Sequence, residues 1–274
     1  MRLNVRHTTR YTYAQPAVHG LQRLRLIPKS TQGQRIIEWS MRFENAREEL
    51  EYEDQHHNTV TLISVTEDAR EVVVECSGLV DTEDNAGVIG RHSGHLPLWS
   101  FMSQTKLTKP GPKLRAFLRE QKQEAEEKPL DYLHRLSAAI RNAVAYRIGE
   151  TSAQTTAEEA IAQGSGVCQD HAHIFLSAAR EADIPARYVS GYLMMNDRVD
   201  QDATHAWAEA HVDGLGWVGF DISNGISPDP RYVRVATGRD YRDAAPVTGI
   251  SFGSTEQVLT VGVTVKQQQD QGQQ

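Results

Sequence analysis

One of the two cysteines in this sequence, Cys168, lies where a thiol could act as a nucleophile. Gly164 and Gly166 release the backbone just before it, and a helical pattern of small and apolar residues follows. The start of a helix offers unpaired N–H groups and a favourable dipole, which stabilise a thiolate. Cys168 is therefore a candidate nucleophile, although the same position also suits a small buried residue.

A histidine and an aspartate complete a set that could carry out acyl transfer. His205 begins an alternating run in which alanines occupy one face and His205 and Trp207 the other. Asp221 ends the next run, and the turn at 213–216 joins the two runs as a hairpin. A slightly staggered register would bring His205 and Asp221 together. The histidine would then deprotonate the thiol, the aspartate would orient the imidazole, and the thiolate would attack an amide carbonyl.

Three motifs, in this order and spacing, carry a family resemblance. They are Gly-Val-Cys-Gln-Asp-His-Ala at 166–172, His-Ala-Trp at 205–207 and Trp-Val-Gly-Phe-Asp at 217–221. Together they resemble the transglutaminase-like superfamily of papain-fold cysteine enzymes. The N-terminal half and the segment 238–249 are similar to bacterial members that carry an N-terminal β-domain and are regarded as candidate cysteine proteases. The resemblance covers nearly the whole chain.

The resemblance also implies a role for each site residue. Cys168 would be the nucleophile, His205 the general base and acid, and Asp221 the residue that orients the histidine. The oxyanion hole would combine the Cys168 backbone N–H with an upstream side-chain donor, for which Tyr146 and Gln163 are candidates. Each candidate also has a structural interpretation, because Tyr146 suits a helix cap in the core and Gln163 suits a position facing water.

Other residues near the motifs have structural and functional interpretations side by side. Asp170 suits a first-turn charge favoured by the helix dipole, or a proton carrier. Trp207 could shield the catalytic groups or pack the cleft wall. A competing zinc site would draw on four side chains: Cys168, Asp170, His171 and His173. The two histidines diverge on a helix and no Cys-x-x-Cys or His-Glu-x-x-His motif accompanies them, so we expect neither a metal nor another cofactor.

The elements that must position these groups divide the chain in two. Val-, Ile-, Thr- and Tyr-rich runs with a period of two dominate as far as residue 103, and they predict strands near 3–13, 34–43, 60–65 and 71–76. The acidic run at 44–54 is typical of a solvated hairpin that guards a sheet edge. Pro and Gly punctuate the polar run at 105–112, where we place the domain boundary.

Beyond this boundary the period becomes helical. Helices are expected after Pro112 and Pro129, and capping-box signals at Thr155 and Thr156 predict a third helix that ends at Gly164. The sequence therefore predicts an α+β protein. Residues 1–108 form an N-terminal antiparallel β-sandwich, residues 109–265 a papain- or transglutaminase-like α+β domain with helices on an antiparallel sheet or barrel, and residues 266–274 a disordered Gln-rich tail.

Composition and charge narrow the choice of partners. The formal net charge of -7 disfavours nucleic acid and anionic membranes, which bind chiefly through positive fields. No apolar run approaches the roughly 20 residues that span a bilayer. The first residues alternate as in a strand, so we expect no secretory signal, a cytoplasmic protein and no disulfide between Cys76 and Cys168.

Three functions remain open from sequence. The favoured function is cysteine-dependent hydrolysis of a peptide or protein amide through a thioacyl-enzyme, because the resemblance is to candidate cysteine proteases. Transfer of the acyl group to an amine would use the same three residues. A non-enzymatic scaffold of the same fold is disfavoured, because all three catalytic positions are filled. The oligomeric state and the role of the N-terminal domain are not encoded in any motif.

Overall fold

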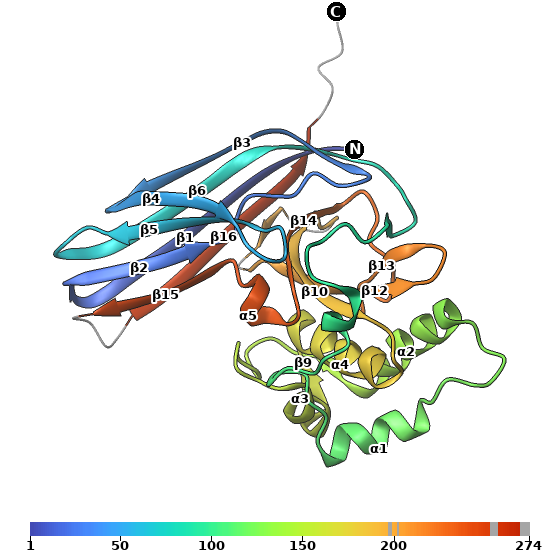
Figure 1. The fold of residues 1–274 in the computed structure, drawn as a ribbon. Coiled ribbons are helices and arrows are strands. Elements are labelled where there is room, and N and C mark those ends of the chain that lie inside the picture. The colour runs from blue at the N-terminus through green and yellow to red at the C-terminus, as the bar shows by residue number, and fades with distance from the viewer. Residues whose placement is uncertain (197–198, 202, 253–256, 269–274) are drawn as a thin grey trace, which may run out of the picture.

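The protein is described by a computed structural model that covers residues 1–196, 199–201, 203–252 and 257–268. Two sheets form a sandwich, and a third sheet carries the helices (Figure 1). The elements in chain order are β1 (Arg2–Ala17), β2 (His19–Leu24), β3 (Gln34–Glu44), β4 (Ala46–Glu53), β5 (Thr59–Val65), β6 (Ala69–Thr82), β7 (Val88–Gly90), the 3-10 helix η1 (Leu98–Phe101), α1 (Pro112–Glu120), α2 (Pro129–Ala143), β8 (Ala145–Tyr146), α3 (Ala157–Gln163), β9 (Ser165–Gly166), α4 (Cys168–Glu181), β10 (Ala186–Leu193), β11 (Asp200–Gln201), β12 (His205–Val212), β13 (Gly216–Phe220), β14 (Tyr232–Gly238), α5 (Tyr241–Ala244), β15 (Val247–Phe252) and β16 (Gln257–Gln267).

The sandwich is antiparallel, as predicted. One sheet has the order β11–β16–β1–β6–β3 and the other the order β15–β2–β5–β4. Exposed and buried residues alternate along β1, because every second side chain turns into the core. The acidic run forms β4, an exposed strand at the edge of its sheet that pairs with β5. Its carboxylates discourage further strand pairing at that edge.

The predicted domain boundaries differ from the observed strand pairing at the C-terminal end. β15 pairs with β2 and β16 with β1, so residues 247–252 and 257–265 lie in the sandwich and not in the second domain, where we had placed them (Figure 1). Conversely, β7 joins the edge of the second domain's sheet beside β13. Lys266 and Gln267 close β16 instead of opening a tail. Residues 269–274 of the predicted tail lie outside the described residues.

The second domain packs helices on an antiparallel sheet of order β14–β10–β12–β13–β7, which confirms the predicted class. The alanines of β12 are buried together with the apolar side chains of α4, so their small size lets the helix approach closely. Thr156 and Glu159 form the predicted capping box of α3, and Gly164 ends that helix in the left-handed conformation at φ 74°. No helix in the described part of the chain is long and apolar enough to cross a bilayer.

The face of this sheet away from α4 is covered by the sandwich. Gln34 exchanges two hydrogen bonds of 2.7 Å with the backbone of Arg234, and Asn58 does the same with Thr237 at 2.8 and 2.9 Å. Both faces of β12 are therefore buried, including the face that carries His205 and Trp207. The sandwich therefore walls the face of this sheet that lies away from α4, a role that the sequence did not assign to any segment.

Candidate active site

Cys168 is the first residue of α4, and its side chain is partly buried. Asp170 fixes this helix start, because its carboxylate accepts the Val167 backbone N–H at 2.8 Å and the Thr151 hydroxyl at 2.7 Å. Gly166 lies against the same carboxylate, and a Cβ on it would stand 2.7 Å from the Asp170 Cβ. Burial raises the pKa of Asp170 despite these bonds. In these contacts Asp170 anchors the helix start, which is the structural interpretation given above.

His205 connects the start of β12 with Asp221. Its Nε2 donates to the Asp221 Oδ2 at 2.6 Å, and the Cys168 thiol interacts with the same buried ring. Burial alone would lower the pKa of His205, but the hydrogen bonds and charges of Asp221 and Cys168 outweigh burial and raise it to about 10. Because Nε2 of His205 bonds Asp221, Nδ1 is the ring nitrogen that is available to the thiol.

The hairpin register explains how two strand ends meet. The pair Ala208 and Phe220 lie opposite each other, and continuing that register sets Asp221 opposite Trp207. His205 is two residues from Trp207 and therefore on the same face. The register is centred on Gly214, so Asp221 is offset by two residues from the position opposite His205. This is the slight stagger that the sequence predicted.

Two residues that the sequence did not single out hold the Asp221 carboxylate. The Tyr232 hydroxyl donates to its Oδ2 at 2.7 Å, and Asn224 donates through its side chain at 2.7 Å and through its backbone N–H at 3.1 Å. Burial would raise the pKa of Asp221, but the bonds from His205, Tyr232 and Asn224 lower it. Asn224 could have been found as a polar residue three positions after Asp221, where it closes a turn. Tyr232 could not, because β14 was not predicted.

Trp207 lies on the His205 side of β12 and is 2% exposed. Its ring packs edge-on against Tyr232, with ring centroids 5.4 Å apart, and stacks beside His205 at 6.2 Å. The side chain therefore shields the bond between His205 and Asp221 from water and also packs the wall. Both interpretations of Trp207 describe one position.

Comparison with known proteins agrees with this geometry. Residues 116–222 match the sequence model of the transglutaminase-like superfamily, and residues 3–81 match the bacterial transglutaminase-like N-terminal region. The chain belongs to the transglutaminase-like superfamily. Membership and fold support a cysteine-dependent enzyme in general.

Individual relatives extend over both domains of this transglutaminase-like protein. An uncharacterised protein of Mycobacterium leprae is 28% identical over 96% of this chain and 98% of its own length, and one of Mycobacterium tuberculosis is 28% identical over 96% and 92%. A crystal structure of a candidate cysteine protease from Cytophaga hutchinsonii superposes with a TM-score of 0.74 at 21% identity, over 97% of this chain and 98% of that one. That likeness shows a shared fold.

The two oxyanion candidates of this transglutaminase-like protein differ in position. Tyr146 ends the short strand β8, which pairs in parallel with β9 and places Tyr146 opposite Gly166. Its side chain is 51% exposed, so the helix cap in the core that we considered is wrong. Gln163 is exposed, as we considered, and donates its amide to Ser165 at 3.1 Å. Only Tyr146 of these two has a strand-to-strand link to the segment that precedes Cys168.

The histidines of the zinc alternative diverge, as predicted. His171 donates to the Val144 carbonyl at 3.0 Å, whereas His173 accepts the Tyr241 backbone N–H at 3.2 Å. Burial lowers the pKa of both, that of His173 to about 3. Among the described residues, the side chains with metal-like spacing are instead Glu53, His57 and His95. They include none of the residues of the zinc alternative.

Proposed function

We propose that this protein hydrolyses amide bonds of peptides or proteins through a thioacyl-enzyme, with Cys168, His205 and Asp221 as its catalytic residues. The observation that carries the proposal is the buried His205 ring, which bonds Asp221 at 2.6 Å through one nitrogen and interacts with Cys168. This is the arrangement of nucleophile, base and orienting acid that acyl transfer requires.

The reaction would proceed in two halves. With the thiol proton held on His205, the Cys168 sulfur bonds the amide carbon, whose C=O electron pair moves onto oxygen. Collapse of that oxyanion breaks the C–N bond, and His205 gives its proton to the leaving amine. His205 then deprotonates a water molecule, the resulting hydroxide attacks the thioester carbon, and the C–S bond breaks to release the acid and restore the thiol.

For the oxyanion we propose the Cys168 backbone N–H and the Tyr146 hydroxyl. The first N–H groups of a helix have no partner within the helix, so that of Cys168 is available. Pairing between Tyr146 and Gly166 ties the phenol to the segment that carries the nucleophile. The Gln163 amide donates to Ser165 at 3.1 Å and to the Glu150 carbonyl at 3.3 Å, so the preference for Tyr146 rests on its pairing with Gly166.

Labelling and turnover test the proposal together. Wild-type protein should react with iodoacetamide faster than a model thiol at neutral pH and should cleave casein or a peptide library. Cys168→Ala should lose both properties. Cys76→Ala is the matched control and should keep both, because the buried Cys76 thiol, whose pKa burial raises to about 12, is inert. If Cys168 reacted no faster than a model thiol, and if no turnover were lost in Cys168→Ala, the result would favour a non-enzymatic scaffold.

Acyl transfer to an amine is the second candidate, favoured by the superfamily match alone. Offering the same casein or peptide with and without a labelled primary amine separates the two reactions. We expect hydrolysis to exceed amine incorporation. The opposite ratio would replace hydrolysis by transfer and leave the catalytic residues unchanged.

A further inference from the structure

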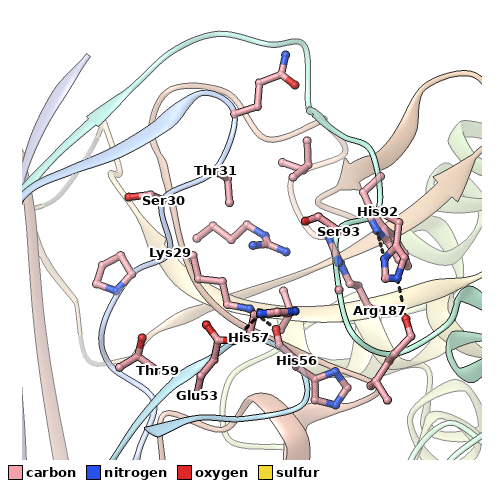
Figure 2. A pocket seen from close by; sticks show the side chains of 18 of the residues that line it. Lys29, Ser30, Thr31, Glu53, His56, His57, Thr59, His92, Ser93 and Arg187 are labelled. Atoms are coloured by element: carbon pink, nitrogen blue, oxygen red, sulfur yellow. Dashed lines mark hydrogen bonds and ion pairs between the residues drawn. The ribbon is translucent and has the colours of Figure 1, made fainter. Parts of the chain in front are cut away.

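A second candidate site lies on the sheet of order β14–β10–β12–β13–β7, on the face that the sandwich covers. A cavity of about 670 Å³ opens there, and none of Cys168, His205 and Asp221 lines it. Figure 2 shows Lys29, His56 and Arg187 gathered around it, with the segment that bears Ser30 and Thr31 along its side. Sites for small molecules have volumes of roughly 300 to 1,000 Å³, so this cavity is large enough for one.

Besides the exposed Arg91, three cations line this cavity, and one buried carboxylate pairs with two of them. Arg187 donates to Glu209 at 2.6 Å, and Arg234 donates to it at 2.7 and 3.1 Å. The Lys29 ammonium donates only to neutral groups, the His56 carbonyl at 2.7 Å and the Thr237 hydroxyl at 2.9 Å. Glu53, an acid at the rim, is bonded to His57 at 2.6 Å. The interior therefore has an excess of positive charge in a chain whose net charge is -7.

Several donors of these groups are unused within the described residues. Arg187 bonds Glu209 through Nε alone, while its guanidinium stacks on Trp217 at 3.9 Å and its Nη atoms donate to no described group. Nη1 of Arg234 and one ammonium hydrogen of Lys29 are likewise unused. His56 also lines the cavity, but its Nε2 bonds the Asp243 carboxylate at 3.2 Å, so its buried Nδ1, which has no partner in the described structure, is not counted among the donors.

The electrostatics of the cavity favour the binding of an anion. Burial, together with the charges of Arg234 and Arg187, holds the pKa of Lys29 well below its usual range. Burial also lowers the pKa of Arg187 to about 10, although Glu209 opposes the shift. Buried cations that repel one another are stabilised by a bound anion, because it offsets both their desolvation and their repulsion.

We propose that this cavity binds the phosphate group of a small organic phosphate ester. A planar carboxylate is satisfied by a two-donor fork, whereas a tetrahedral dianion accepts from several directions, as the free donors of two arginines and a lysine allow. The cavity exceeds the size of a bare phosphate ion, and the rings of Phe101 and Trp217 line the remainder as apolar walls for the organic part. The site is independent of the proposed hydrolysis.

Calorimetry and thermal unfolding of the full chain test the ligand class. The probes are inorganic phosphate, glucose 6-phosphate and glutarate, with potassium chloride at matched ionic strength as the control. We expect both phosphates to bind and raise the unfolding temperature, and glucose 6-phosphate to bind more tightly. Binding of glutarate as tightly as glucose 6-phosphate, equal binding of the free ion and the ester, or no effect beyond that of chloride would overturn the proposal.

Variants of Lys29 locate the site. Lys29→Met should bind glucose 6-phosphate about tenfold more weakly or worse, because it loses a charged donor and leaves no carboxylate unpaired. Lys106→Met, which removes an exposed lysine outside the cavity, should bind as wild type. Lys29→Glu should not bind the ester, because its carboxylate occupies the place of the anion. For the same reason, its unfolding temperature in the absence of ligand should be no lower than that of wild type. Unchanged binding in Lys29→Met and Lys29→Glu would contradict the assignment.

Discussion

At the residue scale, the Asp221 carboxylate is the most heavily bonded group of the site. It accepts from His205, from Tyr232 and twice from Asn224 while 1% exposed. A buried charge is stable only when its hydrogen-bonding capacity is met, so these donors keep Asp221 ionised and aimed at His205. The proposed catalytic residues were chosen from local motifs, whereas Tyr232 lies on a separate strand that no local pattern revealed.

The raised pKa of His205 makes stability depend on pH. A histidine titrates near 6.5 when unfolded, and here its pKa is about 10, so the folded protein holds a proton that the unfolded chain has lost between these values. The stabilisation is fully present below about pH 6.5 and declines as the pH rises towards 10. Urea unfolding at several pH values should show this decline in wild type and a flatter curve in His205→Gln. Parallel curves would contradict it.

At the scale of elements, the approach of β9 to α4 determines where the nucleophile lies. The sequence predicted that a helix starts at Cys168 after two glycines at 164 and 166. The structure shows why position 166 is a glycine: its backbone packs against the Asp170 side chain. The helices were predictable because their caps and prolines are local signals. β14 and β7 were not, because short strands gain their stability from partners far away in the chain.

Gly166→Ala tests that packing. Its new Cβ would stand 2.7 Å from the Cβ of Asp170, so the helix start must shift. We expect a loss of about 1 to 3 kcal/mol in the free energy of unfolding, measured with urea, and a larger loss of turnover, because Cys168 moves with the helix. Gly262→Ala is the matched control, since a Cβ there meets nothing within 4 Å. Equal behaviour of the two variants would remove Gly166 from this role.

At the scale of the whole molecule, the sandwich and the helical domain form one interlocked structure. Val263 and Val265 of β16 are buried in the same cluster as Leu3 and Val5 of β1, and that cluster continues into α4. Composition and periodicity predicted both architectures, but not which strands close the sandwich. Pairing between chain ends depends on contacts across the full length of the sequence, which a local pattern cannot encode.

Truncation tests this dependence. A chain that ends at Pro246 lacks β15 and β16 and exposes the edges of β1 and β2, so we expect loss of cooperative thermal unfolding and aggregation. A chain that ends at Gln268 keeps both strands and is the matched control, with unfolding like that of wild type. Cooperative unfolding of the shorter chain would show that the sandwich does not need its C-terminal strands.

The meeting of β1 with β16 also has a consequence for synthesis. β1 must wait for β16, because it lies between β6 and β16 and β16 is translated much later. The whole helical domain is translated in the interval, with one side of β1 unpaired. The nascent chain therefore carries an open strand edge until β16 emerges, when the sandwich can close.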